Sequence, residues 1–473
     1  MSIVLDGSAG ITTNSGTVVS TTDATISGLT VGKGGGAVST STAVGVSALT
    51  ANTTGGNNVA IGYQAGLAQS TGGQSTFVGA QAGLAGSDID YATAVGYQAL
   101  SSITSGDFNT ALGAQALKSN TTASNNTAVG YQALYTNSTG TRNNAVGYKA
   151  AYSISTANDI TAFGDQAALN TTAGLNTAIG SAALFNNTTG QENTVLGAGA
   201  MFGSAGTSTG SYNTAIGRQA LSNNTTATNN TAVGYQAGVS ATTGGYNAHF
   251  GSSAGYSVTT GYDNTCIGYI AGYYITTGFR NTCIGNNSGS YSTNLVTGSN
   301  NTYVGFRATA SSSSVSQELV VSTDATFGKG ANTGYINANG GGVYQGNNSS
   351  SWSTTSDFRL KKNIVDNTEG LDKIAQIQVR NFEYRLPEEV TELDPSCAVD
   401  RKGIQLGVIA QELQQVCPDC VKEESTGVLS VDPDNLTWYM VNAIKDLKAL
   451  VDAQATLISG QAAEIAELKA KVG

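Results

Sequence analysis

Apolar and polar positions follow a strict repeat over more than half of this chain. The motif Asn-Thr-Ala-Val-Gly-Tyr-Gln-Ala-Leu, clearest at residues 126–134, recurs sixteen times between Gly45 and Gly305, mostly at steps of 17 residues. The residue before each repeat glycine is always apolar. The third residue after it is alanine in every copy except the one that carries Ser288. A fixed period of this kind is typical of a solenoid, in which each copy forms one coil and buries its apolar face against its neighbours.

The repeat therefore predicts a mainly β rod over residues 41–308. Parallel strands stack at about 4.8 Å, so sixteen coils give a length of roughly 77 Å. Asparagine four residues before most of the glycines predicts a ladder of side-chain amides, and the glycine itself predicts a tight bend. Each coil offers only one large apolar residue and several alanines, which is a thin core for an isolated chain. We therefore expect several copies of the chain to associate along the rod axis.

Three of the residues that replace alanine at one position of the repeat carry a side chain with possible chemistry. His249 lies two residues before its glycine, where alanine is usual, and Cys266 and Cys283 fill the same position one coil apart. We interpret all three as variation within a packed column, although strand spacing would bring the two thiols close enough for a bridge.

Tyrosine directly follows several of the repeat glycines. Such residues could form a row for sugar stacking, or they could pack between coils, which is the interpretation we favour. They are Tyr63, Tyr97, Tyr131, Tyr148, Tyr235 and Tyr269.

The segments on either side of the repeat lack its period. We expect residues 1–40 to form an N-terminal adaptor and residues 309–355 to form a distal β segment. Within the latter, residues 318–321 predict a strand, and Gly334-Tyr335-Ile336 predicts a turn that leads into another strand. The exposed tip would contain the aromatic residues Tyr335, Tyr344 and Trp352.

Charge and cysteine content exclude several classes of partner. Only 11% of the 473 residues are charged and the net charge is −10, which argues against nucleic acid. No secretory signal or membrane-spanning stretch is visible, so we expect a protein made in the cytoplasm without membrane insertion. Cys417 and Cys420 form a Cys-Pro-Asp-Cys sequence, but no second pair lies at zinc-ribbon spacing. We therefore expect free thiols, no metal and no cofactor.

A charged, globular composition begins at Ser356-Asp357-Phe358-Arg359-Leu360-Lys361. A serine hydroxyl attacks a carbonyl group only when a base removes its proton, and a desolvated neutral lysine can be that base. We expect residues 356–473 to form a small α+β domain. Its predicted elements are a short helix at 374–377, a strand at 379–384, a helix after 406–413 that ends at Pro418, and a long helix at 436–472.

The long terminal helix carries a heptad pattern that predicts a coiled coil. Its two seams do not decide between a dimer and a trimer. The residues are Ile444, Val451, Ile458, Ile465 and Val472 in one seam, and Leu447, Gln454, Gln461 and Leu468 in the other.

Two resemblances to known families extend this interpretation. Residues 41–308 resemble the β-roll heads of trimeric autotransporter adhesins and repeats in phage tail fibres, which implies a homotrimer. Residues 356–473 resemble the intramolecular chaperone auto-processing domain of phage endosialidases and tail fibres. The second resemblance rests on Ser356-Asp357-x-Arg359-Leu360-Lys361, on Gly407-x-Ile409-Ala410-Gln411-Glu412 and on the terminal helix.

The second resemblance also implies residue roles. Ser356 would be the nucleophile and Lys361 its general base, with Lys362 as an alternative base. The cut would fall between Thr355 and Ser356, and the trimer of C-terminal domains would leave after it has guided folding of the fibre.

The favoured hypothesis is a structural, receptor-binding tail fibre of a phage, located in the virion. It would bind other virion proteins through its N-terminus and a glycan or protein receptor on the host surface. Self-cleavage is the only enzymatic activity that we expect. One alternative is a bacterial surface adhesin, which would need a secretion signal and a membrane barrel. Another is a polysaccharide-degrading fibre, which would need paired carboxylates, and acidic residues are sparse in 41–308.

Overall fold

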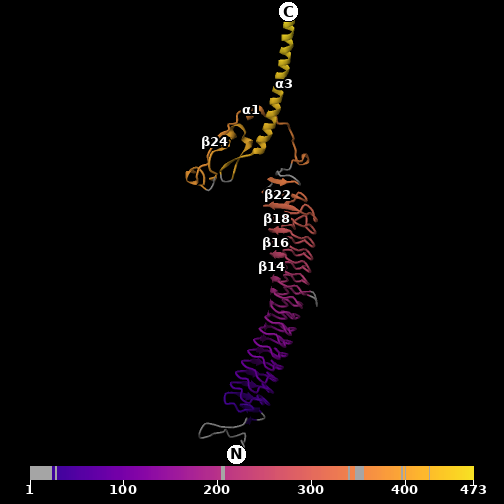
Figure 1. The fold of residues 1–473 in the computed structure, drawn as a ribbon, viewed down its shortest axis with the longest axis vertical. Coiled ribbons are helices and arrows are strands. Elements are labelled where there is room, and N and C mark those ends of the chain that lie inside the picture. The colour runs from indigo at the N-terminus through magenta and orange to yellow at the C-terminus, as the bar shows by residue number, and fades with distance from the viewer. Residues whose placement is uncertain are drawn as a thin grey trace, which may run out of the picture. The chain divides into compact units, whose positions relative to one another are not determined.

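The computed structural model describes residues 24–26, 29–203, 208–338, 341–346, 356–395, 398–399, 401–424 and 427–473. The chain divides into two compact units, Met1–Thr355 and Ser356–Gly473. Most of the first unit is a solenoid of stacked coils (Figure 1). The mainly β fold class that the repeat predicts is confirmed. Most of the expected adaptor, residues 1–23 and 27–28, lies outside the described residues.

Within the described residues, sixteen short strands form the parallel ladder that corresponds to the repeat. Each strand ends at or next to a repeat glycine and pairs in register with the strand one coil away. They are β3 (Thr42–Val44), β4 (Val59–Ile61), β5 (Thr76–Val78), β6 (Thr93–Val95), β7 (Thr110–Leu112), β8 (Thr127–Val129), β9 (Asn144–Val146), β10 (Thr161–Phe163), β11 (Thr177–Ile179), β12 (Thr194–Leu196), β13 (Thr214–Ile216), β14 (Thr231–Val233), β15 (Ala248–Phe250), β16 (Thr265–Ile267), β17 (Thr282–Ile284) and β18 (Thr302–Gly305).

The predicted asparagine ladder is confirmed. Asn126 Nδ2 donates to Asn109 Oδ1 at 3.2 Å, and Asn126 Oδ1 accepts the backbone N–H of Asn143 at 2.9 Å. The same amide also donates to the carbonyl of Gly140 in the next coil at 2.9 Å. Because these side chains are buried, each bond satisfies a polar group that would otherwise be costly to bury.

The repeat glycine is required by the stacking as well as by the bend. Gly130 has a φ of 129°, which other residues rarely adopt, and a Cβ atom there would lie 2.4 Å from the carbonyl oxygen of Gly147. A side chain at this position would push adjacent coils apart.

The apolar residue before each glycine faces outward, not into the coil. In β8, Ala128 is fully buried while Val129 is only partly buried, and in β7 the side chain of Leu112 is 47% exposed. The coil core is made instead by the middle residue of each strand, which is alanine in most coils, the alanine three residues after the glycine and the residue four after it, such as Leu134. The number of large apolar residues in the core varies between coils, since Ile103 is buried beside Leu100 in one coil.

Large residues in the strand column are accommodated by glycine across the coil. Phe77 replaces the usual alanine, and the facing positions in its own and the preceding coil are Gly83 and Gly66 rather than leucine. A Cβ atom added at Gly83 would lie 2.3 Å from Phe77 Cδ1, and one added at Gly66 would lie 2.9 Å from Phe77 Cδ2. The volume enclosed by a coil is thus kept nearly constant by paired changes.

We expect Gly83→Ala to destabilise the rod by about 1–3 kcal/mol through overpacking against Phe77. The backbone itself tolerates a side chain, since Leu100 has a φ of 51° at the equivalent position. The double variant Phe77→Ala/Gly83→Leu recreates the pairing of Ala94 with Leu100 and should recover much of the loss. Thermal melting of the three proteins checks this. A double variant less stable than Gly83→Ala would contradict the volume pairing.

His249, Cys266 and Cys283 continue the inward column, as expected. His249 pairs in register with Cys266, which pairs with Cys283, and all three are fully buried. Both cysteines are free. The neighbouring Cys283 and His249 lower the pKa of the Cys266 thiol, whereas burial acts in the opposite direction. Among the described residues, neither ring nitrogen of His249 has a hydrogen-bond partner.

Aromatic side chains on the coil surface stack on one another between coils. The rings of Tyr131 and Tyr148 lie 5.6 Å apart at 15°, and those of Tyr135 and Tyr152 lie 5.1 Å apart at 5°. Each ring in such a pair covers one face of its partner, so part of the aromatic surface is used in packing between coils. For these residues the structure favours packing between coils over sugar stacking.

The parallel ladder continues beyond the sequence period. β20 (Glu318–Ser322) pairs in parallel with β18 and adds a seventeenth coil, as the strand predicted at 318–321 allows, and β22 (Thr333–Ala338) follows it. The predicted turn at 334–336 was wrong, because these residues lie within β22. Trp352 lies outside the described residues, as does the side chain of Tyr344.

Antiparallel strands close both ends of the ladder. β22 pairs with β23 (Gly341–Gln345), and at the other end β2 (Leu29–Gly32) pairs with β3 and with β1 (Ala24–Ile26). This arrangement covers both open edges of the parallel ladder with strands of the same chain. The short strands β19 (Ala308–Thr309) and β21 (Thr326–Phe327) form a separate parallel pair beside the last coils.

The second unit is a small α+β domain. The predicted strand, the helix before Pro418 and the long terminal helix are confirmed, whereas the first helix ends at Ile374 instead of beginning there. The elements are α1 (Leu371–Ile374), β24 (Arg380–Phe382), β25 (Gln405–Gly407), α2 (Ala410–Val416), β26 (Val421–Glu423), β27 (Leu429–Val431) and α3 (Pro433–Val472), with 3-10 turns η1 (Phe358–Leu360), η2 (Pro387–Glu389) and η4 (Pro418–Cys420).

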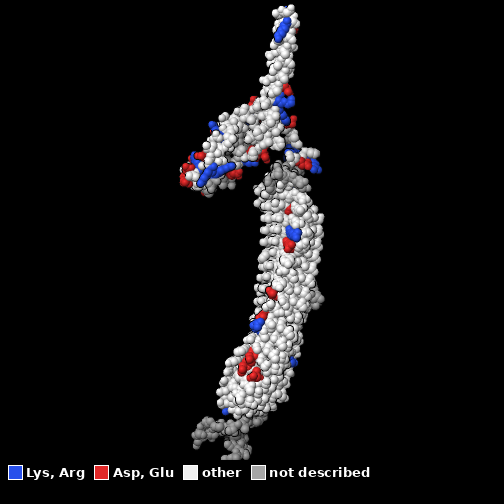
Figure 2. Space-filling view, viewed as in Figure 1, with Lys and Arg blue, Asp and Glu red and all other residues white. Residues whose placement is uncertain are grey.

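Charged residues are distributed unevenly between the units. Figure 2 shows few Lys, Arg, Asp and Glu on the visible face of the solenoid and many on the second unit. Among the helices in the described part of the chain, none has an apolar stretch long enough to span a membrane.

Candidate active site at the start of the C-terminal unit

The first residues of the second unit fold into a tight turn. The carboxylate of Asp357 caps η1 by accepting the backbone N–H of Arg359 at 2.9 Å, and it also accepts from the Arg359 guanidinium. This ion pair holds the pKa of Asp357 below its ordinary value. The N–H of Lys361 closes the turn on the carbonyl of Phe358 at 3.1 Å. The chain therefore reverses between Ser356 and Lys361.

The turn brings the two predicted site residues into contact. Lys361 Nζ donates to Ser356 Oγ at 2.7 Å. This distance suits proton transfer between a hydroxyl group and an amine, provided that the amine is neutral when it acts. Within the described segments, Lys362 makes no hydrogen bond to Ser356. Thr355, the other residue of the expected cleavage site, lies outside the described residues.

The contact lies in water in a single chain. Ser356 and Lys361 are both exposed, and so are the apolar neighbours Phe358 (74%) and Leu360 (75%). A lysine becomes a base more readily where burial favours its uncharged form. One chain therefore supplies the pair of side chains but not the dry environment.

The segment after the site is anchored on the terminal helix. The N–H of Leu371 donates to Asp446 Oδ2 at 2.9 Å, and Asn442 Nδ2 donates to the carbonyl of Asn367 at 2.9 Å. Gly370 is buried between them, since a Cβ atom there would lie 2.3 Å from Asp446 Oδ2. Sequence reasoning missed these residues, because partners 75 positions apart leave no local signal.

The motif Gly407-x-Ile409-Ala410-Gln411-Glu412 has a structural explanation. Glu412 of α2 accepts two bonds from the guanidinium of Arg380 in β24, at 3.0 and 3.1 Å. The same motif leads into the core of the unit, which contains Leu413 and Tyr439. These contacts fix the strands and α2 on the first turns of α3.

Carboxylates of the solenoid serve its backbone. Asp90 Oδ1 accepts the N–H of Gly73 at 2.6 Å, and Asp107 Oδ1 accepts the N–H of Asp90 at 3.0 Å. Glu318 is buried and accepts from the Tyr303 hydroxyl at 2.9 Å and from the N–H groups of Ser311 and Gly330. These three carboxylates are therefore committed to the structure of the solenoid.

The comparison with protein families identifies a known domain in this part of the chain. Residues 356–422 match the family model described as the chaperone of endosialidase (Peptidase_S74). The match begins at Ser356, at the boundary between the two compact units. No solved structure matches the chain. The protein therefore consists of a β-solenoid rod of about 17 turns followed by a C-terminal chaperone-of-endosialidase domain.

Proposed function

We propose that this chain forms the shaft of a phage tail fibre or a related virion appendage, and that its C-terminal domain assembles three copies and is then released by self-cleavage. The observation that carries the proposal is the 2.7 Å contact between Lys361 Nζ and Ser356 Oγ at the first residue of the chaperone-of-endosialidase match. Parallel stacking of three long chains is slow and can slip in register, so a trimerising end that aligns the chains first is useful.

An exposed apolar stripe on the solenoid supports association of the rod. The outward residue of each repeat strand is Val, Ile, Leu or Phe, and the stripe follows the ladder without a break from Val44 to Val304. Large continuous apolar surfaces on soluble proteins mark interaction sites. We assign this stripe to contacts between copies of the rod.

The terminal helix supports the same assembly. Residues 447–473 of α3 and its C-cap are exposed, including Ile458 (64%) and Ile465 (53%) of the predicted seam. A helix whose apolar seam faces water in the single chain is stabilised by burying that seam against other copies. We further propose that packing of three copies buries the exposed apolar residues Phe358 and Leu360, and thereby dries the Ser356–Lys361 pair.

The proposed reaction consumes one water molecule. Lys361 Nζ takes the Ser356 hydroxyl proton while Oγ forms a bond to the carbonyl carbon of Thr355. The C–N bond then breaks, the nitrogen of Ser356 takes the proton from Lys361, and Thr355 remains as an ester on Oγ. Water hydrolyses the ester, which leaves a carboxylate on Thr355 and a free amine on Ser356.

Host recognition would belong to the part that remains on the virion. We place receptor contacts, to a glycan or a protein, on exposed turns of the solenoid or in residues 309–355, since the C-terminal domain would leave. The N-terminal segment would attach to other virion proteins. Native mass spectrometry of the purified product tests the assembly. It should contain three copies of residues 1–355, and a monomer would contradict the proposal.

The stripe makes a separate prediction. Ile179→Glu/Leu196→Glu introduces charges into the stripe on β11 and β12, so the assembled rod should dissociate at a clearly lower urea concentration. Leu175→Glu is the matched control. Leu175 lies on a turn in the same coil and is 51% exposed. The equivalent position in the next coil already carries a glutamate, Glu192. Size-exclusion chromatography with light scattering measures dissociation. Equal effects of the two changes would show that the stripe is not the interface.

A further inference from the structure

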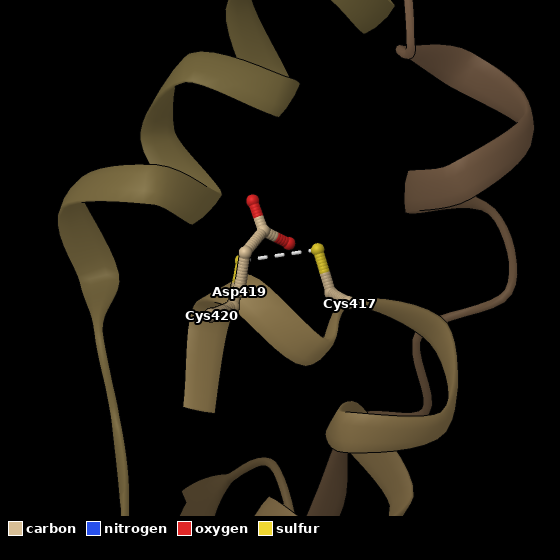
Figure 3. Close-up of side chains that lie close together, drawn as sticks. All are labelled: Cys417, Asp419 and Cys420. Carbon is tan, nitrogen blue, oxygen red and sulfur yellow. Dashed lines mark hydrogen bonds between the residues drawn. The ribbon is translucent and has the colours of Figure 1, made fainter. Parts of the chain in front are cut away.

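Two cysteines and a carboxylate come together in the turn between α2 and β26. Cys417 Sγ and Cys420 Sγ lie 3.0 Å apart, and the side chain of Asp419 projects from the same turn η4 (Figure 3). One ligand atom from each of the three residues lies within 4.8 Å of the other two. The sequence pattern showed the two thiols but not the carboxylate as a third ligand.

The turn is held by the elements on both sides of it. The N–H of Cys417 donates to the carbonyl of Leu413 in α2 at 2.7 Å, and the N–H of Cys420 donates to the carbonyl of Cys417 at 3.0 Å. From α3, Asn435 Nδ2 donates to the carbonyl of Asp419 at 2.7 Å. These bonds fix the backbone from which the three side chains project before any ligand binds.

The Asp419 carboxylate also has a positioning partner. Its Oδ2 accepts the hydroxyl of Tyr439 at 2.6 Å, and the ammonium group of Lys373 lies 4.2 Å from the centre of the Tyr439 ring. A ligating carboxylate is usually oriented by such an outer hydrogen bond. Both sulfurs are fully buried in the core of the unit, whereas Asp419 is exposed, which provides a route from solvent.

We propose that Cys417, Asp419 and Cys420 form a binding site for a thiophilic divalent cation such as Zn²⁺, with water as the fourth ligand. Thiolate sulfur and carboxylate oxygen are both zinc ligands, and three protein ligands with one open position make a recognised coordination set. Two thiolates and a carboxylate exceed the charge of the cation by one, and Lys373, which also pairs with Glu369, lies over the Tyr439 ring beside the site. Tetrahedral bonds of ~2.3 Å would place the sulfurs ~3.8 Å apart. A modest rotation of the two cysteine side chains meets that requirement.

The experiment uses the full-length Ser356→Ala chain, which should remain a single species, after treatment with a chelator and a reductant. Co²⁺ serves as the probe, because thiolate coordination gives it a charge-transfer absorption. We expect one Co²⁺ per chain, displaced by Zn²⁺. Asp419→Asn keeps the core intact and should weaken binding at least ~10-fold, as should Tyr439→Phe through loss of the outer hydrogen bond.

A matched pair of variants separates this site from the other buried thiols. Cys417→Ala/Cys420→Ala should abolish the absorption, whereas Cys266→Ala/Cys283→Ala should leave it unchanged. Circular dichroism verifies that each variant is folded. Binding that survives in Cys417→Ala/Cys420→Ala would overturn the proposal. Failure of the reduced chain to bind Co²⁺ would also overturn the proposal, whether or not a Cys417–Cys420 disulfide is found before reduction.

Discussion

Replacing Ser356 with alanine should leave an intact chain of 473 residues under conditions in which the unmodified protein separates into 1–355 and 356–473. The variant removes the proposed nucleophile and touches nothing buried, since Ser356 is exposed in the single chain. Folding and trimerisation should therefore be retained, because they depend on packing and not on the hydroxyl group. Electrophoresis and intact-mass measurement of both proteins provide the test.

Two lysine variants test the second half of the site. Lys361→Ala should slow the cut by roughly 10²–10⁴-fold, the usual contribution of a general base. Lys362→Ala is the matched control and should cut normally, since Lys361 is the residue whose Nζ lies 2.7 Å from Ser356 Oγ. The reverse result, with Lys361→Ala cut and Lys362→Ala intact, would transfer the role of the base to Lys362.

Charges in the seam of the terminal helix should abolish both assembly and cleavage. Ile458→Asp/Ile465→Asp would bury unpaired carboxylates from every copy, and an uncompensated buried charge costs about 3–5 kcal/mol. Self-association should therefore weaken at least about 100-fold. Because the Ser356–Lys361 pair is exposed in one chain, we expect the cut to disappear as well. Analytical ultracentrifugation and electrophoresis measure the two effects together.

The control adds the same charges on the opposite face of the helix. Thr456→Asp/Ala463→Asp lies away from the heptad seam, so this variant should trimerise and cut like the unmodified protein. A seam variant that stays monomeric but still cuts would show that a single chain completes its own site. Loss of assembly in both variants would show that helix stability, not the seam, is responsible.

The sequence predicted the solenoid because its period is a direct physical consequence of stacking. Asn126 and Gly130 recur at fixed spacing, since an amide ladder and a close approach of backbones are needed in every coil. The direction of the apolar residues was not predictable in the same way. Adjacent strand residues such as Ala128 and Val129 point to opposite faces, and the repeat does not say which face is enclosed.

Contacts across the coil were also invisible in the sequence. Phe77 and Gly83 compensate in volume because they face each other, and only the fold defines that pairing. The repeat count also missed the seventeenth coil, because its strand lacks the repeat motif. β20 replaces the repeat signal with Glu318, whose backbone N–H nevertheless continues the ladder by donating to Asn301 Oδ1 at 2.9 Å.

The candidate site was accessible from a short local pattern. Ser356 and Lys361 lie five residues apart, and the Asp357-capped turn between them brings their side chains together. Their proposed roles stay predictions. The attachment of Gly370 to α3 could not be predicted, because it joins segments that are distant in sequence and depends on the folded core.

The most direct test of the account is terminal sequencing and intact-mass analysis of the unmodified chain as it folds and assembles. We expect two fragments that appear only after trimerisation, one ending at Thr355 and the other beginning at Ser356. A chain that folds, trimerises and stays whole for days would contradict the proposed roles of Ser356 and Lys361, and a new N-terminus at any other residue would place the nucleophile elsewhere.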